Sequence, residues 1–490
     1  MEKIHLISLG CPKNLVDSER MLALLDRNGY ALTEEAEDAD VVIVNTCGFI
    51  GPAKEESLDV IFEASRLKKE GRCRALIVAG CLSQRYGDTL KRELTEADAF
   101  LGLADVEQIV AHCDRLLGHR HLLEVTAVKD QSAERRPAKG ALAKDRVGGS
   151  QQSSSSVPPV QMEKRQNPAD TPGEAIRYEG ARHLLTPKHS AYLRIADGCD
   201  NRCSYCAIPL IRGPYRSRPH EALIAEAQVL CDQGVRELNL IAQDITRYGA
   251  DLYGEPRLSD LIEALSELSG LRWIRLLYTH PAHFSKEVIG CIARNEKVCR
   301  YVDLPIQHIS DPLLRAMNRK VNGDAIRSLI EDLRAKAPGI AIRTSLIVGF
   351  PGETEVQFEE LLGFVSETRF ERLGVFTYSQ EEDTPAAAFE DPVPEEVKRE
   401  RMDRLMMQQQ ETTAEMHGAL IGERLQVLVD RPGEESRIRW VGRTEWDAPE
   451  VDGQVLITEG DARPGDFVDV MITDSEAYDL VGRIVPEELV

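Results

Sequence analysis

The chain has 490 residues, a formal net charge of −22 and a hydrophobic content of 42%. This length exceeds what one hydrophobic core supports, and no apolar run is long enough to cross a bilayer, which excludes a single small domain and an integral membrane protein. The acidic balance argues against a general nucleic-acid binder and favours basic partners. The N-terminus lacks the segments of a signal peptide, so we expect a cytoplasmic protein whose 11 cysteines are reduced and available to metals.

Residues 1–128 are predicted to form an N-terminal domain built on a parallel sheet. Three short apolar runs, each followed by a turn and a helix-like segment, are Ile4–Gly10, Asp40–Thr46 and Arg74–Gly80. Apolar strands that alternate with helices indicate a parallel sheet covered by helices on both faces, and therefore an α/β fold class.

Residues 129–179 have a different composition, rich in Ser, Pro, Gly, Gln and mixed charge. Such a segment offers almost nothing to bury, so we interpret it as a disordered linker. A docking segment is the alternative that composition alone leaves open.

Residues 180–418 resume the alternation of strands and helices with a longer period. Six strands are predicted at 191–196, 235–242, 271–278, 300–307, 341–349 and 373–379, with amphipathic segments between them and one long polar helix at 394–420. This pattern indicates an open or partial βα barrel, in which chemistry is expected at the carboxyl ends of the strands.

Residues 419–490 change pattern again. Five short strands are separated by turns of Gly, Pro and Asp. They predict a small five-stranded antiparallel β-barrel.

Three cysteines, Cys199, Cys203 and Cys206, follow directly after the first strand of the predicted βα barrel. Structural zinc sites and ordinary four-iron clusters take four ligands, so three thiolates on one tight loop leave one iron free to bind a small molecule. The alternative is a zinc site that takes a distant fourth ligand.

A second triad lies in the N-terminal domain. Cys11, Cys47 and Cys81 each follow one of the three predicted strands, separated by 36 and 34 residues. Because the carboxyl ends of parallel strands meet at one edge, we expect these thiols to converge and hold a second cluster. The other five cysteines, Cys73, Cys113, Cys231, Cys291 and Cys299, are predicted to be buried hydrophobic residues.

The spacing Cys-x-x-x-Cys-x-x-Cys after the first strand of a βα barrel resembles the signature of the radical S-adenosylmethionine superfamily. Together with the N-terminal cysteine triad and a C-terminal barrel similar to the TRAM module, it resembles the methylthiotransferases over nearly the whole chain except the linker. Four segments resemble in sequence the branch that acts on small-subunit ribosomal protein S-twelve: "SLGCPKNLVDSE", "NTCGFI", "LLTPKHSAYLRIADGC" and "AQDITRYG". The tRNA-modifying branch usually has Gln in place of Pro-Lys in the first of these.

The resemblance implies a radical methylthiotransferase that adds a methylthio group to the β-carbon of an aspartate in that ribosomal protein. It implies that Cys199, Cys203 and Cys206 hold a 4Fe–4S cluster that cleaves S-adenosylmethionine, and that Cys11, Cys47 and Cys81 hold an auxiliary 4Fe–4S cluster that carries the sulfur. An external electron donor and a sulfur donor are implied as partners. The chemistry is borne by the clusters, so no catalytic side chain is assigned.

Polar residues and a glycine at other strand ends are expected to contact S-adenosylmethionine: Gln243, Asp244, Gln307, Gly349 and Glu353. A structural role for each is the alternative. His280 and His308 also lie at strand ends, where we expect packing rather than ligation.

The charge of the last 70 residues bears on the substrate. Residues 421–490 contain 17 Asp and Glu against 7 Arg and no Lys. A domain that binds tRNA neutralises phosphates with basic residues, so an acidic barrel favours a basic ribosomal protein and makes tRNA an unfavourable partner. The alternatives are a tRNA adenosine methylthiotransferase and a non-catalytic iron–sulfur protein.

Overall fold

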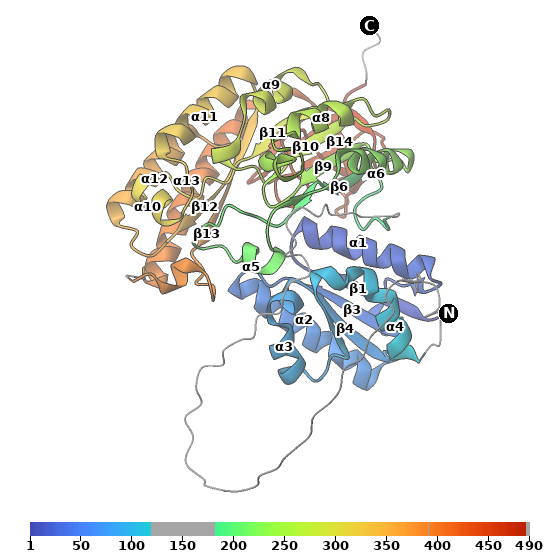
Figure 1. Ribbon diagram of the computed structural model, residues 1–490. Helices are drawn as coiled ribbons and strands as arrows, with labels where there is room; N and C mark the ends of the chain where they lie inside the picture. Colours follow the sequence, from blue (N-terminus) through green and yellow to red (C-terminus); the bar gives the residue numbers. More distant parts are fainter. Residues whose placement is uncertain (119–181, 391, 487–490) are drawn as a thin grey trace, which may run out of the picture.

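The computed structural model describes residues 1–118, 182–390 and 392–486 (Figure 1). An N-terminal sheet domain, a central βα core and a C-terminal β-barrel follow one another along the chain. The predicted linker at 129–179 lies outside the described residues.

The N-terminal domain is a five-stranded parallel sheet in the order β2-β1-β3-β4-β5. Its elements are β1 (Lys3–Ser8), α1 (Pro12–Arg27), β2 (Ala31–Leu32), η1 (Ala36–Asp38), β3 (Val41–Thr46), α2 (Gly51–Glu70), β4 (Ala75–Gly80), α3 (Cys81–Glu93), β5 (Ala99–Leu101), η2 (Leu103–Gln108) and α4 (Ile109–Leu117). The three predicted strands are β1, β3 and β4. The side chains of β3 alternate between two apolar clusters, Val41 and Ile43 on one face and Val42 and Val44 on the other, because helices cover both faces of the sheet.

The core is an open, six-stranded parallel sheet in the order β13-β12-β11-β10-β9-β6, which confirms the predicted partial barrel. Its strands are β6 (Ser190–Arg194), β9 (Glu237–Ile241), β10 (Trp273–Leu276), β11 (Val298–Asp303), β12 (Ala341–Val348) and β13 (Arg372–Thr377). The helices are α5 (Ile208–Arg212), α6 (His220–Asp232), α7 (Ala250–Tyr253), α8 (Leu258–Ser266), α9 (Lys286–Arg294), α10 (Asp311–Ala316), α11 (Gly323–Lys336), α12 (Glu355–Thr368) and the long α13 (Glu395–Ala419). A two-stranded ribbon, β7 (Ala196–Asp197) with β8 (Arg216–Ser217), frames the cysteine loop.

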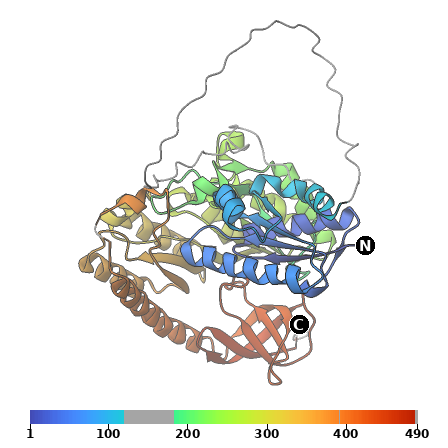
Figure 2. The same ribbon diagram turned by 90° about the horizontal axis from the view of Figure 1, so that it is seen from below.

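The C-terminal domain is a closed barrel of five strands, and Figure 2 shows α13 leading into it. The strands are β14 (Arg424–Pro432), β15 (Trp440–Arg443), β16 (Val455–Glu459), β17 (Phe467–Glu476) and β18 (Asp479–Ile484). The prediction of an all-antiparallel barrel is wrong for one pair, because β16 runs parallel to β18. A closed ring with an odd number of strands cannot alternate direction throughout, so one parallel pair is unavoidable.

The C-terminal barrel docks at the amino ends of the core strands. Glu237, the first residue of β9, is fully buried and pairs with Arg275 of β10 at 3.0 Å and with Arg443 of β15 at 2.8 Å. Arg372, the first residue of β13, pairs with Asp447. The opposite, carboxyl ends of the core strands are therefore left to the N-terminal domain.

Candidate active site

The three cysteines of the N-terminal sheet converge at one edge. Each follows the carboxyl end of a strand, and their turns lie close to one another. A Cβ on Gly10, which has φ +86°, would lie 2.9 Å from the Cβ of Cys47, and one on Gly48 would lie 2.9 Å from the carbonyl of Cys81. Only glycine permits this approach, so the loops bearing Cys11, Cys47 and Cys81 are pressed together.

The thiols of this N-terminal triad affect one another electrostatically. Burial raises the pKa of Cys81 to about 12; the charge of Arg212 opposes this rise, and Cys11 and Cys47 add to it. Burial also raises the pKa of Cys11, but the nearby charges of Lys13 and Arg212 and two backbone N–H donors outweigh it, so the net shift is downward. Cationic side chains therefore surround a site built for anionic sulfur.

The second triad occupies the loop between β7 and α5 at the carboxyl end of β6. Burial, together with the negative charges of Asp244 and Cys203, raises the pKa of Cys199 to about 11. The fully buried guanidinium of Arg319 lies 3.7 Å from the sulfur of Cys203 and also donates to the carbonyl of Pro305. Hydrogen-bond donors to cluster thiolates tune the potential of the cluster, so Arg319 belongs to this site although no sequence pattern singled it out.

Neither cysteine triad brings its three sulfur atoms within 4.8 Å of one another. Zn–S bonds of about 2.3 Å place tetrahedral sulfur ligands about 3.8 Å apart. Among the described residues, the one set of three ligand-type side chains whose ligand atoms all lie within 4.8 Å of one another is Asp244, His280 and His283. Both cysteine triads are therefore wider in this structure than a closed tetrahedral zinc site.

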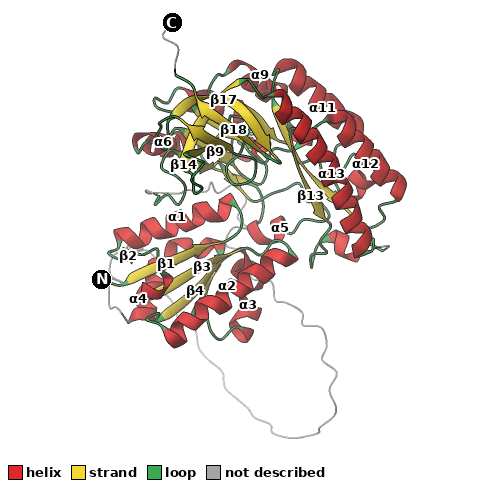
Figure 3. Cartoon of the chain, turned by 180° about the vertical axis from the view of Figure 1, so that it is seen from behind, coloured by secondary structure: helices red, strands yellow, loops and turns green. Residues whose placement is uncertain are grey.

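Arg212 connects the two triads. Its guanidinium, which is fully buried, donates to the carboxylate of Asp197 at 3.1 Å and to the side-chain oxygen of Asn14 at 2.8 Å. The same guanidinium lies 3.6 Å from the sulfur of Cys81. Asp197 stands two residues before Cys199, and Figures 1 and 3 show α5, which ends at Arg212, between the N-terminal sheet and the core. The two cysteine sites therefore belong to one interface.

Three of the predicted S-adenosylmethionine residues lie at the carboxyl ends of core strands. The buried side-chain oxygen of Gln243 has no hydrogen-bond partner. Asp244 accepts a hydrogen bond of 2.9 Å from Asn201, which lies inside the cysteine loop. Gln307 has a left-handed backbone with φ +71° and bridges to Leu346 of β12. The orphaned amide oxygen of Gln243 is the kind of acceptor that a bound polar molecule satisfies.

The other two predicted residues, Gly349 and Glu353, lie in the turn after β12 and face α13. The buried carboxylate of Glu353 accepts hydrogen bonds from the N–H of Gly349, from Arg401 at 2.8 Å and from His308 at 3.1 Å. A Cβ on Gly349 would collide with the side chain of Lys398. These contacts hold the turn against α13, and His308 is packed as predicted.

His280 and His283 form a cluster with Asp244 that was not predicted as such. His283 is hydrogen-bonded to Asn201 at 2.9 Å, and Asn201 in turn donates to Asp244. Burial, together with the charge of Arg319, lowers the pKa of His280 to about 2. His283 and the amide of Asn201 therefore connect the cysteine loop to the ends of β9 and β10.

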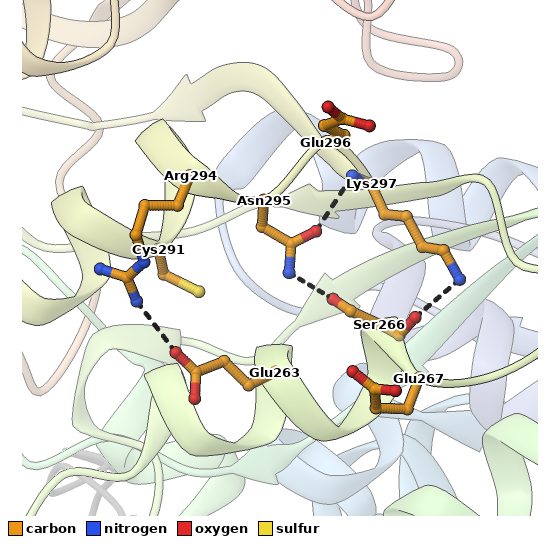
Figure 4. A pocket seen from close by; sticks show the side chains of 8 residues that line it. All are labelled: Glu263, Ser266, Glu267, Cys291, Arg294, Asn295, Glu296 and Lys297. Carbon is orange, nitrogen blue, oxygen red and sulfur yellow. Dashed lines mark hydrogen bonds and ion pairs between the residues drawn. The ribbon is translucent and has the colours of Figure 1, made fainter.

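A surface pocket lies elsewhere, on the outer side of the core between α8 and α9 (Figure 4). Its polar groups bond one another: Arg294 pairs with Glu263 at 3.0 Å, and Lys297 donates to the carbonyl of Ser266 at 2.6 Å. It contains none of the six cysteines of the triads, so its position gives no support for a catalytic role.

A second contact between the domains centres on Glu381, which follows β13. Its carboxylate, 1% exposed as a residue, accepts hydrogen bonds of 2.9 Å from the N–H of Gly51, from Lys54 and from Arg85. These three donors belong to α2 and α3, whose amino ends carry the loops of Cys47 and Cys81. This contact of Glu381 with Gly51, Lys54 and Arg85, called here the Glu381 contact, therefore fixes the N-terminal cysteine triad relative to the core.

Glu381→Gln is expected to weaken the Glu381 contact between the two domains. Removing the carboxylate leaves Lys54 and Arg85 without their partner, which for a buried pair costs about 3 kcal/mol. Amide hydrogen exchange in the first turn of α2 is expected to accelerate by about 100-fold, measured by mass spectrometry. Glu382→Gln is the matched control, because Glu382 is exposed and contacts Tyr86 at 3.3 Å. Equal rates of amide hydrogen exchange in the two variants would contradict a stabilising role for the Glu381 contact.

Comparisons with known proteins agree with this architecture. Residues 3–102 match the uncharacterized protein family UPF0004, residues 193–365 the radical SAM superfamily and residues 421–485 the TRAM domain. A solved structure of TsrM from Kitasatospora setae, described as a radical S-adenosylmethionine methyltransferase, has a similar fold with a TM-score of 0.50 and 15% identity, covering 79% of this chain and 77% of that one. Fold and site thus define a radical S-adenosylmethionine enzyme with an iron–sulfur cluster.

Relatives similar over their whole length refine this class. Proteins named ribosomal protein uS12 methylthiotransferase RimO are 47% identical in Heliobacterium modesticaldum, covering 99% of this chain and 95% of the relative, and 46% identical in Geotalea uraniireducens, covering 99% of each. The chain belongs to this family of methylthiotransferases. None of the described helices combines the length and hydropathy that crossing a bilayer requires.

Proposed function

We propose that this chain transfers a methylthio group to the β-carbon of an aspartate in ribosomal protein uS12, using S-adenosylmethionine and two 4Fe–4S clusters. It is a radical S-adenosylmethionine methylthiotransferase of the uS12 branch. The observation that carries the proposal is the meeting of two cysteine triads at one domain interface, joined by Arg212. One triad alone would serve a simpler radical enzyme, whereas sulfur insertion needs a second site that holds sulfur.

In this proposal Cys199, Cys203 and Cys206 hold the radical-generating cluster, and Cys11, Cys47 and Cys81 hold the auxiliary cluster. When bound, the clusters and S-adenosylmethionine supply the electron and sulfur chemistry, including removal of hydrogen from a carbon that no side chain could deprotonate at neutral pH. The chain itself supplies thiolate ligands and hydrogen-bond donors to sulfur.

S-adenosylmethionine is assigned to the carboxyl ends of the core strands beside the cysteine loop. Gln243 offers an unpartnered buried oxygen, and Asp244 and Gln307 flank the same end of the barrel. Gly349 and Glu353 contribute by holding the turn after β12 against α13, so their effect on the cofactor is one of position.

The partners follow from charge and from redox chemistry. The C-terminal domain contains 17 Asp and Glu against 7 Arg, which suits a basic ribosomal protein and disfavours tRNA. An external electron donor and a sulfur donor complete the reaction. All 11 cysteines are free in the structure, in keeping with a reducing cytoplasm.

Mass spectrometry of a strain that lacks this chain tests the proposal. Ribosomal protein uS12 is expected to lose the mass of one methylthio group, and tRNA nucleosides are expected to stay unchanged. Loss of a methylthioadenosine from tRNA with intact uS12 would establish the tRNA alternative. Purified enzyme that forms no deoxyadenosine with reductant and S-adenosylmethionine would favour a non-catalytic iron–sulfur protein.

A further inference from the structure

Lys13 is a buried cation at the interface between the N-terminal domain and the core. It lies in the first turn of α1, two residues after Cys11, and is 4% exposed. Its ammonium lies 2.8 Å from the centre of the ring of Tyr278, which follows β10 of the core. The side chain therefore reaches from the auxiliary site across to the mouth of the barrel.

The acidic groups around Lys13 are already paired with arginines. Asp17 pairs with Arg194 at 2.7 Å, Asp197 pairs with Arg212 at 3.1 Å, and Asp303 pairs with Arg343 at 3.0 Å. In the part of the chain that the structure describes, no carboxylate lies within ion-pair distance of the Lys13 ammonium, which lies over the ring of Tyr278. The anion that the chain itself places beside this ammonium is the thiolate of Cys11, which would ligate the auxiliary cluster, so a carboxylate that pairs with Lys13 comes from outside the chain.

Tyr278 is held in place to receive this cation. Its backbone has φ +63°, which a bulky aromatic residue rarely adopts. The N–H of Tyr278 donates to Asp303 at 2.9 Å, and its carbonyl accepts from the N–H of Ile245 at 3.0 Å. Backbone strain that the surroundings maintain is typical of functional sites, and here it fixes an aromatic platform at the carboxyl end of the barrel.

We propose that Lys13 binds the carboxylate of the substrate aspartate and thereby selects an acidic side chain for methylthiolation. This inference rests on the proposed function, because that function makes an aspartate the substrate. The ammonium lies between the auxiliary triad and the carboxyl ends of the core strands, where the β-carbon of the substrate has to come. A charge-assisted bond in a desolvated site discriminates strongly between a carboxylate and a neutral amide.

Binding measurements with two substrates and three enzymes test the proposal. Anaerobically reconstituted wild-type enzyme, Lys13→Gln and Lys13→Arg are titrated with uS12 that carries either the target aspartate or asparagine in its place. The wild type is expected to bind the aspartate form at least about 30-fold more tightly than the asparagine form. Lys13→Gln is expected to bind the two forms with affinities that differ by no more than about threefold. Lys13→Arg keeps the charge and is expected to retain a preference of about tenfold.

The matched control is Lys91→Gln, because Lys91 lies on the same domain and is 42% exposed; it is expected to discriminate like the wild type. A Lys13→Gln enzyme that still prefers aspartate by about 30-fold would overturn the proposal. Loss of about four of the roughly eight irons per chain from Lys13→Gln would also overturn the proposal, because it would assign Lys13 to charge balance of the auxiliary cluster. Wild-type enzyme that never modifies uS12 would instead refute the proposed function, so the two failures are distinguishable.

Discussion

Replacing Cys199, Cys203 and Cys206 together by alanine is expected to lower the iron content from about eight to about four per chain and to abolish cleavage of S-adenosylmethionine. These three thiols lie on one loop at the carboxyl end of β6, and Arg319 donates to the sulfur of Cys203. The auxiliary triad lies on another domain with its own sheet, so it is expected to keep its irons. Iron analysis and chromatography of deoxyadenosine after anaerobic reconstitution measure the two effects.

The control replaces two cysteines of the same domain that pack with its apolar core. Cys291 is 1% exposed and belongs to the core of the barrel, and Cys231 packs against that core. Cys231→Ala/Cys291→Ala is expected to hold about eight irons and to cleave S-adenosylmethionine. A triple variant of the cysteine loop that retained both clusters would show that this loop is not a cluster site.

Replacing Cys11, Cys47 and Cys81 together by alanine is expected to have a different outcome: continued cleavage of S-adenosylmethionine and complete loss of methylthio transfer. The reason is that the proposed cleavage site lies on the core, whereas the proposed sulfur-carrying site lies on the N-terminal sheet. Iron is expected to fall from about eight to about four per chain. Deoxyadenosine and methylthiolated uS12 are measured in the same reaction.

Two buried cysteines of the N-terminal domain provide the control for this variant. Cys73 and Cys113 pack into the apolar clusters on opposite faces of the sheet. Cys73→Ala/Cys113→Ala is expected to keep both activities, at some cost in stability. Methylthiolated uS12 made by the variant without Cys11, Cys47 and Cys81 would rule out an auxiliary cluster as the source of the transferred sulfur.

Most of the fold could be predicted because its strands are apolar runs rich in β-branched residues, which are recognisable in the sequence. All nine strands predicted in the first two domains are present, and so are the five of the C-terminal barrel. The strands that were not predicted are short: β2, β5, β7 and β8 have two or three residues each. Two or three residues cannot establish a period, so neighbouring strands decide whether such segments pair.

The site was predictable where it depends on position along the chain and not where it depends on contacts between domains. The six cysteines stand at regular places after strands, so their spacing reveals them. Arg212 and Glu381 carry no comparable signal, since their partners Cys81 and Lys54 lie 131 and 327 residues away. Such pairs become visible only when the domains are placed together.

By itself, therefore, the sequence determined the three domain types, the two cysteine triads and the family, because local patterns of polarity and spacing specify strands and ligand loops. Only the tertiary structure decided that both triads belong to one interface, that arginines already neutralise the carboxylates around Lys13, and which pair of barrel strands runs parallel. The physical reason is that ion pairs, burial and ring closure depend on groups brought together by folding, and no local pattern encodes which distant groups those are.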